Sequence, residues 1–438
     1  MNRREFLKGT LSVAALAPLA KLAAKAGADG NKSSDLAKGP QVTRRRYRDT
    51  AMTLPMLGFG MMRLPTLGSD NTQIDYATVE KQIARALEAG VNYFDTAYFY
   101  HGGRSETCVG DVLSKFPRDS YYLASKMPVR MVRSEADVKR IFEEQLKKCK
   151  TPYFDFYLLH NLNQARWKDA IRFKVYEYLL EQKKQGRIRK LGFSFHDKPE
   201  VLETIAKAHP WDFAQIQLNY LDWTMYRSRE QYEILVKYNI PAIIMEPLKG
   251  GALARLNPET EDVFRKADPK ASVASWAFRY VGSLPNVLCI LSGMTLMEHL
   301  EDNIRTFTDF KPLTDSERAV ITQALAVYRK TRLIPCTNCR YCMPCPVGVN
   351  IPRNFEIFNQ FRITGRARRF PIDYNGIPED QRASECVSCG ACLKKCPQKI
   401  NIPAELKKIA AEAEKLRTRG RRRNAMNLMS DPDEFELV

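Results

Sequence analysis

The chain has 438 residues, of which 69 are Lys or Arg and 50 are Asp or Glu, so its formal net charge is +19. A chain of this length can bury large hydrophobic cores and does not need disulfide staples to fold. Its basic residues have no recognisable nucleic-acid-binding module around them, so nucleic acid is not an expected partner.

The N-terminus has the features of an export signal. Arg3 and Arg4 precede a short apolar run, and a processing site of the A-x-A type follows at Ala24–Ala26. We interpret residues 1–26 as a twin-arginine signal peptide, which predicts the twin-arginine export machinery as a partner and the periplasm as the location. The apolar run is far shorter than the roughly 20 residues of a membrane span, so no stable span is expected. Residues 27–50 are expected to form a linker.

Residues 51–312 alternate short apolar runs with segments of helical length. Such alternation over about 250 residues is typical of an α/β protein with a closed (β/α)8 TIM barrel. No G-x-G-x-x-G follows the first run, which argues against an open dinucleotide-binding sheet. The eight expected strands are residues 57–61, 91–96, 121–125, 154–159, 188–194, 213–217, 240–245 and 287–291, and helices are expected at residues 75–89, 135–148 and 168–185, among others.

Polar side chains follow three successive strands of this barrel. Asp95 lies at the end of the second strand and Tyr100 follows it, while Lys126 follows the third strand and His160 the fourth. Because the strand C-termini of a barrel form one rim, these four side chains are expected to converge there. A nearby ammonium group lowers the pKa of a tyrosine from about 10 and makes it a usable proton donor or acceptor. Asp95 would hold Lys126 in place, and His160 would orient a substrate carbonyl.

The segment Phe94–Glu106, together with Lys126 and His160, resembles the aldo/keto reductases. The resemblance implies that Tyr100 is the general acid/base, that Lys126 and Asp95 tune it, and that a small-molecule carbonyl or alcohol is the substrate. It also implies a nicotinamide cofactor, NAD(P)(H). The residues whose positions match nucleotide contacts of the family are Ser194, Gln217, Leu248, Gly250, Gly293 and Asn303.

The nucleotide preference is expected to differ from that of many relatives. Family members that bind NADPH commonly place basic residues around the adenosine 2′-phosphate, whereas this chain has Gly293, Met294 and His299 there. Without that basic clamp, NAD(H) is favoured over NADP(H).

Two cysteine arrays lie in residues 333–410, after a bridging helix predicted for residues 313–332 that begins with a capping box. Cysteines at consecutive x2 spacings, followed by Cys-Pro, are typical of 4Fe-4S ligands, whereas a structural zinc site usually has two separated C-x2-C pairs. In two-cluster ferredoxins the fourth cysteine of each run crosses to the other cluster. We therefore predict a small, mainly helical ferredoxin-like domain with two 4Fe-4S clusters, held by Cys336, Cys339, Cys342 and Cys396, and by Cys386, Cys389, Cys392 and Cys345.

The remaining charged and cysteine residues carry weaker signals. Cys108, Cys149 and Cys289 have no cysteine neighbours and are expected to be buried structural thiols. Residues 411–438 form a charged tail that is expected to be loosely ordered from about residue 417. Between the cysteine runs lie Arg362, Arg366, Arg368 and Arg369, which either compensate the anionic clusters or offer a dock for an acidic redox partner.

The whole chain resembles the branch of the aldo/keto reductases that has a C-terminal ferredoxin-type domain. It is expected to be an exported iron-sulfur oxidoreductase that interconverts a carbonyl and an alcohol. Nicotinamide passes two electrons as hydride, whereas each cluster passes one. Two alternatives therefore stay open: a periplasmic electron-transfer protein whose barrel is a scaffold or binding site, and a nicotinamide-only reductase with structural clusters.

Overall fold

The computed structural model describes residues 36–429 except 69, 332, 365, 366 and 368. The proposed signal peptide lies outside the described residues. The described chain divides into two compact units. The first comprises residues 36–218, 222–245 and 281–312, and the second comprises residues 219–221, 246–280 and 313–429. Within the described residues, no helix is long and apolar enough to cross a membrane.

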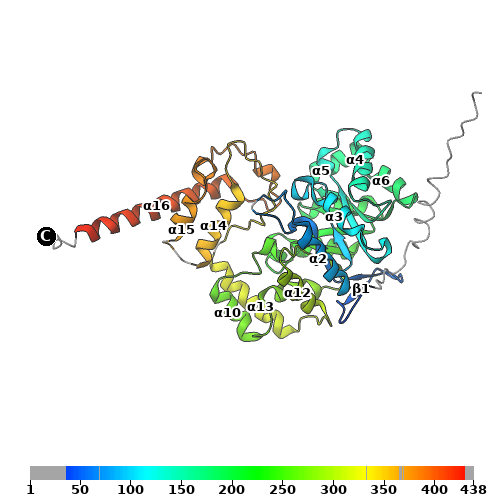
Figure 1. Ribbon diagram of the computed structural model, residues 1–438, viewed down its shortest axis with the longest axis horizontal. Helices are drawn as coiled ribbons and strands as arrows, with labels where there is room; N and C mark the ends of the chain where they lie inside the picture. The colour runs from blue at the N-terminus through cyan, green and yellow to red at the C-terminus, as the bar shows by residue number, and fades with distance from the viewer. Residues whose placement is uncertain (1–35, 69, 332, 365–366, 368, 430–438) are drawn as a thin grey trace, which may run out of the picture. The chain divides into compact units, whose positions relative to one another are not determined.

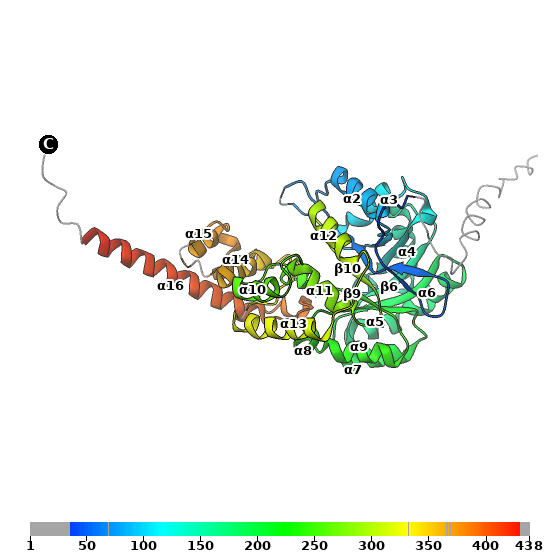
Figure 2. The ribbon, with the colours of Figure 1, turned by 90° about the horizontal axis from the view of Figure 1, so that it is seen from below.

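The first unit contains a closed barrel of parallel strands in the order β10-β3-β4-β5-β6-β7-β8-β9. In Figure 2, β6, β9 and β10 lie inside a ring of helices. The prediction of a (β/α)8 barrel is thus confirmed. The strands are β3 (Leu57–Gly60), β4 (Tyr93–Asp95), β5 (Tyr122–Met127), β6 (Phe154–Leu162), β7 (Ile188–Phe195), β8 (Phe213–Gln217), β9 (Ala242–Met245) and β10 (Val287–Ser292).

Large side chains fill the inside of the barrel. Tyr93, Tyr122, Phe156 and Phe213 are essentially unexposed and pack on one another edge to face. Gly58 leaves room for this core, because a Cβ there would lie 2.8 Å from Cys289 Sγ and 3.2 Å from Cδ1 of Tyr93. A strand that is buried on both faces has a continuous run of apolar residues in the sequence. Such runs predicted the positions of all eight strands.

The surrounding helices follow the expected pattern with one correction. The segment 168–185 is two helices, because Lys174 between them has a left-handed φ of 48° that no continuous helix allows. Side-chain caps at Ser134 and Asn163 begin α4 and α5. These helices are α2 (Tyr76–Glu88), α3 (Ser105–Leu113), α4 (Glu135–Lys148), α5 (Gln164–Arg172), α6 (Val175–Lys184), α7 (Pro199–Ala208), α9 (Ser228–Lys237) and α12 (Met297–Phe307).

The segment expected to be a linker, residues 27–50, contains the first strand of a hairpin. β1 (Arg44–Arg46) pairs antiparallel with β2 (Thr53–Pro55). Arg45 donates hydrogen bonds to the carbonyl oxygens of Leu284, at 3.0 Å, and of Val287 at the start of β10. This part of the basic run is therefore structural, since its guanidinium groups satisfy backbone acceptors at the N-terminal end of the barrel.

The second unit has two hydrophobic cores. One joins α10 (Pro258–Ala267), α11 (Val273–Gly282) and α13 (Asp315–Tyr328), and Arg279 braces it through two hydrogen bonds to Glu317, at 2.6 and 2.9 Å. The predicted capping box at Thr314 begins α13. The second core packs the cysteine loops against α14 (Ile351–Thr364), α15 (Arg369–Asn375) and α16 (Ile402–Met429).

The expected disorder of the tail from residue 417 is wrong as far as residue 429, because α16 continues through it and is the long helix in red in Figure 1. Its composition explains the difference. Residues 417–429 contain five Arg residues together with Ala, Leu and two Met residues, all of which are good helix formers. Earlier in the same helix, ion pairs one turn apart, such as Glu405–Lys408 and Glu412–Lys415, add stability.

Candidate active site

Four polar side chains converge at the C-terminal rim of the barrel, as the sequence predicted. Asp95 ends β4, Lys126 lies in β5 and His160 in β6, while Tyr100 begins the short 3-10 turn η3 (Tyr100–Gly103) after β4. All four are buried, and Tyr100, with 9% exposure, is the most accessible.

Lys126 connects the group. Its ammonium donates to Asp95 Oδ1 at 2.5 Å, to the carbonyl oxygen of Thr96 at 2.7 Å and to Tyr100 Oη at 3.3 Å. The ring of His160 lies edge-on to that of Tyr100, with 6.1 Å between centroids. A fixed ammonium at a phenol oxygen favours the phenolate, and an imidazole beside it can hydrogen-bond to a carbonyl that approaches the same hydroxyl.

Burial sets the protonation of the flanking groups. It raises the pKa of Asp95, and the Lys126 ammonium opposes that rise. Burial also lowers the pKa of His160 well below its ordinary value, and the charge of Lys126 adds to the effect. His160 is therefore a neutral imidazole at physiological pH, a hydrogen-bonding group and not a cation.

A second histidine, which the sequence did not mark, fixes the turn that carries Tyr100. His101 Nε2 accepts the N–H of Leu64 at 3.0 Å, so its Nδ1 carries the proton that faces the carbonyl oxygen of Asn71 at 2.6 Å. His101 has a left-handed φ of 52°. Its two hydrogen bonds hold this unfavourable conformation and thereby the position of Tyr100.

Two arginines that the sequence analysis did not identify also lie around His160. Arg130 is stacked on the ring of Phe99, with Cζ 3.6 Å from the centroid. Arg166 donates to the carbonyl oxygen and side-chain oxygen of Asn161, at 2.7 and 2.6 Å. Both charges contribute to lowering the pKa of His160. In the sequence, each appears only as a basic residue a few positions after a strand. This pattern is too common to indicate a functional residue.

Two proposed nicotinamide contacts, Ser194 and Gln217, are fully buried at the ends of β7 and β8. Ser194 Oγ accepts the N–H of Asn161 at 2.7 Å, which leaves its own hydroxyl hydrogen available to a ligand. Gln217 Nε2 donates to Asp222 Oδ2 at 2.6 Å. Both side chains therefore lie on strands that are adjacent in the barrel.

Beyond β10, Gly293 packs against an arginine that the sequence analysis did not consider. A Cβ on Gly293 would lie 2.9 Å from Cβ of Arg63, in the turn after β3. Asn303 on α12 donates to Ser292 Oγ at 3.0 Å. Arg305, a further cation of this helix, pairs with Asp302 and is exposed.

The loop after β9, which carries Leu248 and Gly250, belongs to the second unit. Lys249 is 3% exposed, and its Nζ donates to Gln398 Oε1 at 3.2 Å. Gly250 has a φ of +67°, and a Cβ there would lie 2.5 Å from Cα of Thr337. The proposed pyrophosphate loop is thus packed against the loop that carries the first cysteines, in a contact that nothing in the sequence indicated.

The cysteines lie in two groups, and each group contains one cysteine from the other run. Burial raises the pKa of Cys339 and of Cys342 to about 12, and the neighbouring thiols that add to both rises are Cys336 and Cys396. For Cys392, burial again raises the pKa, and the contributing thiols are Cys386, Cys345 and Cys389. Two sets of four thiols result, and in each set one member comes from the other run.

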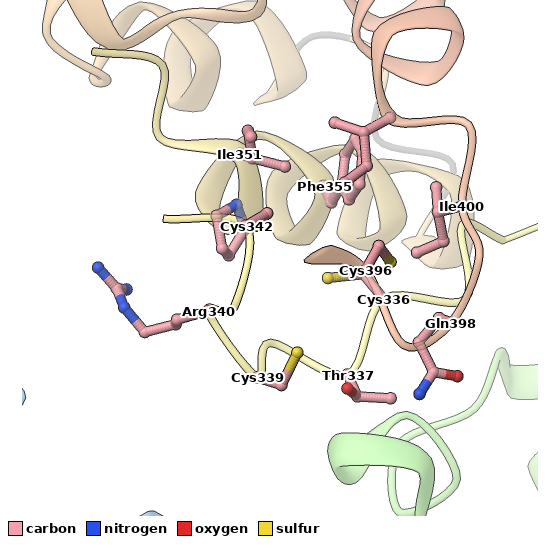
Figure 3. Close-up of a pocket in the computed structure, with 12 residues that line it drawn as sticks. Cys336, Thr337, Cys339, Arg340, Cys342, Ile351, Phe355, Cys396, Gln398 and Ile400 are labelled. Atoms are coloured by element: carbon pink, nitrogen blue, oxygen red, sulfur yellow. The ribbon is translucent and has the colours of Figure 1, made fainter. Parts of the chain in front are cut away.

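The first set lines a small cavity of about 20 Å³ that is partly open to solvent (Figure 3). In the described part of the chain, no three or more His, Cys, Asp or Glu side chains meet at the spacing of a single metal ion; these thiols line the cavity walls instead. Asn338 and Arg340 have left-handed φ values, and the N–H of Asn338 donates to Cys336 Sγ at 3.4 Å. Thiolate donors with backbone N–H groups directed at sulfur suit an iron-sulfur cluster.

The remaining cysteines, Cys108, Cys149 and Cys289, are buried, as expected. All eleven cysteines lie in the described residues and are free thiols. Of the inter-run arginines, Arg362 donates to the carbonyl oxygen of Thr331 and Arg369 pairs with Asp373, whereas Arg366 and Arg368 lie outside the described residues.

A parallel eight-stranded barrel with an Asp, a Tyr, a Lys and a His at one rim defines an oxidoreductase that acts on carbonyl and alcohol groups. The sequence profile of the aldo/keto reductase family matches residues 56–326, and that of the 4Fe-4S dicluster domain matches residues 335–400. The chain belongs to the aldo/keto reductase family and has a C-terminal 4Fe-4S dicluster domain.

Similar proteins match the barrel region. The oxidoreductase YqkF of Bacillus subtilis is 26% identical over 63% of this chain and 94% of its own length. The NADH-specific methylglyoxal reductase of Escherichia coli is 23% identical over 58% of this chain and 90% of its own length. An aldo-keto reductase of Bacillus halodurans shares the fold, with a TM-score of 0.54 and 24% identity over 65% of this chain and 96% of its own.

Proposed function

We propose that this protein is an exported reductase of small carbonyl compounds in which Tyr100 is the general acid. The observation that carries the proposal is the buried Lys126 ammonium, which lies 3.3 Å from Tyr100 Oη while Asp95 holds it from the other side. A bound nicotinamide would supply or accept the hydride.

The residues of this chain would handle the substrate and its proton. Neutral His160 would donate a hydrogen bond to the carbonyl oxygen and orient it toward Tyr100. Tyr100 would give its proton to that oxygen as negative charge develops there, and Lys126 would stabilise the resulting phenolate. In the reverse direction Tyr100 would take the proton of the alcohol.

Ser194 and Gln217 would hold the carboxamide of the nicotinamide, and the two sets of thiols would hold two 4Fe-4S clusters, which exchange one electron at a time. Methylglyoxal is the first substrate to test, because the similar protein of Escherichia coli is an NADH-specific methylglyoxal reductase.

The test compares Tyr100→Phe with Tyr98→Phe in the anaerobically purified full chain. Tyr98 is a matched control because its hydroxyl donates to Glu144 on α4, away from Lys126. We expect Tyr100→Phe to lower kcat/KM for carbonyl reduction about 100-fold or more, with an unchanged circular-dichroism spectrum. Tyr98→Phe should stay within about threefold of the wild type, since surface substitutions are nearly neutral. Equal activity of both variants would refute the role of Tyr100.

Export is tested separately, by changing Arg3 and Arg4 to Lys and fractionating the cells. We expect the protein to remain in the cytoplasm, because the twin-arginine route depends on this pair. Undiminished periplasmic protein would contradict the proposed signal.

A further inference from the structure

Lys249 is a buried charge in the second unit. Among the Lys, Arg, Asp and Glu residues of that unit that the structure describes, it is the only one that is buried, with 3% exposure. It begins the turn η6 (Lys249–Gly251), which follows β9. An ammonium group is costly to bury unless hydrogen bonds and an opposite charge compensate it. The fold is therefore expected to place an anion near this side chain.

The ammonium of Lys249 lies beside the first set of thiols. Its Nζ donates to Gln398 Oε1 at 3.2 Å, and Gln398, two residues after Cys396, lines the cavity of that set (Figure 3). In the same turn, Gly250 lies against the residue that follows Cys336, because a Cβ on this glycine would be 2.4 Å from the carbonyl oxygen of Thr337. Two contacts thus hold the turn against the loops of the first set.

The second set, which comprises Cys345, Cys386, Cys389 and Cys392, differs at the corresponding position. In the repeat of the two cysteine runs, Gln398 after Cys396 corresponds to Val347 after Cys345. Val347 is 38% exposed, and its side chain cannot accept a hydrogen bond from an ammonium. The charged residues near the second set in the sequence are exposed and of both signs, namely Glu379, Asp380, Glu385, Lys394 and Lys395. Water and salt screen such exposed charges.

Other charged residues near the first set are more exposed than Lys249. Arg340, which lines the cavity, and Lys399, which follows Gln398, are exposed. Glu246 is partly buried and carries the opposite charge, and its carbonyl oxygen accepts the N–H of Lys249 at 3.0 Å. It weakens the field of Lys249 without cancelling it, because the ammonium is the more deeply buried of the two charges and is bonded to a residue that lines the cavity.

A buried cation changes the redox chemistry of the group that the first set would hold. A 4Fe-4S cluster with four thiolates is anionic and gains a further negative charge when it is reduced, and its reduction potential depends on nearby charge, hydrogen bonds and solvent exposure. A fixed positive charge stabilises the reduced form more than the oxidised form. The field of the ammonium therefore raises the reduction potential.

We propose that Lys249 sets the reduction potential of the cluster held by the first set and makes this cluster easier to reduce. In the step concerned, the cluster gains one electron from a one-electron donor, which is thereby oxidised, and no bond forms or breaks. Leu248 and Gly250, on either side of Lys249, match nucleotide contacts of the family, so the same turn would serve both cofactors. The proposal requires that the first set holds a cluster but does not depend on carbonyl reduction.

The test is a reductive titration of the anaerobically purified full chain with sodium dithionite, in which the electron paramagnetic resonance signal of each cluster is followed against the potential. Cys389→Ser changes a ligand of the second set and thereby shows which signal belongs to which cluster. The variant is Lys249→Met, which removes the charge and keeps the length of the side chain. The matched control is Lys399→Met, which removes the same charge at an exposed position three residues after Cys396.

We expect a change in the first cluster of Lys249→Met alone. At the midpoint potential of this cluster in the wild type, its ratio of reduced to oxidised form should fall at least about tenfold, which corresponds to a potential about 59 mV lower for one electron. Lys399→Met and Lys249→Arg should each change the ratio by about threefold or less, because solvent already screens the first charge and arginine keeps the second. The second cluster should keep its potential in all three variants.

An equal change in Lys249→Met and Lys399→Met, no change in either, or a change confined to the second cluster would overturn the proposal. If Lys249→Met binds less iron than the wild type, Lys249→Gln, which can still bond to Gln398, takes its place. Loss of the first cluster from both variants would show that Lys249 is structural and would also overturn the proposal. The titration contains neither carbonyl compound nor nucleotide, so its outcome is independent of Tyr100, whose variant tests the proposed function separately.

Discussion

The contact between Gly250 and Thr337 should make the loop after β9 and the first thiol set depend on each other. Gly250→Ala perturbs this contact, and Gly251→Ala is its matched control. Both glycines have left-handed φ values, +67° and +95°, but a Cβ at Gly251 would meet nothing within 4 Å. The two variants therefore share the backbone cost and differ in the collision with Thr337.

The magnitudes follow from this difference. An alanine in the left-handed region costs about 1–2 kcal/mol, which both variants pay. Only Gly250→Ala must also displace backbone beside Cys336, and overpacking of this kind costs about 1–3 kcal/mol. We take this cost to raise the free energy of the folded state but not that of the transition state for cluster loss. The cluster should then be lost about 5- to 150-fold faster from Gly250→Ala than from Gly251→Ala.

The assay follows the loss of iron-sulfur absorbance in guanidinium chloride under anaerobic conditions. In the absence of denaturant, the electron paramagnetic resonance signal of one cluster should also change in Gly250→Ala and not in Gly251→Ala. Equal rates of cluster loss and identical spectra for the two variants would refute the reasoning.

Three further predictions concern the thiols, the histidine and the nucleotide. Cys396→Ser should remove the same spectroscopic signal as substitution of the first set, and Cys345→Ser the signal of the second set; the opposite result would contradict the cross-over grouping. Since the pKa of His160 lies well below its unfolded value of about 6.5, the unfolded state binds more protons below that pH. The free energy of unfolding should therefore fall as pH falls below about 6.5, by up to about 1.4 kcal/mol per unit from this group, and His160→Gln should show a shallower decline in denaturant titrations. By calorimetry NADH should bind at least as tightly as NADPH, because Gly293 has no side chain to donate a charge-assisted hydrogen bond to the 2′-phosphate, and each such bond is worth about 1.5–3 kcal/mol. Tighter binding of NADPH would contradict this and make Arg63 the first residue to substitute.

The barrel and its rim could be predicted because their signals are local. Strands buried on both faces are apolar runs, and the topology of a parallel barrel places the residues after consecutive strands on one rim. Asp95, Lys126 and His160 needed no further information to be placed together.

Contacts between distant segments could not be predicted. Arg45 satisfies carbonyl oxygens near β10, and its sequence shows only a basic run. The break at Lys174 depends on one left-handed residue that has no glycine signal. The helix beyond residue 417 was missed because absence of apolar periodicity was given more weight than helix propensity.

The bond between Lys249 and Gln398 has a consequence for the timing of synthesis. These residues are 149 positions apart, so the ribosome completes the loop after β9 long before its partner exists. The loop reaches its final form only when the last cysteine run has been made and folded. A chain interrupted before the second cysteine run therefore lacks the side chain that accepts the hydrogen bond of Lys249.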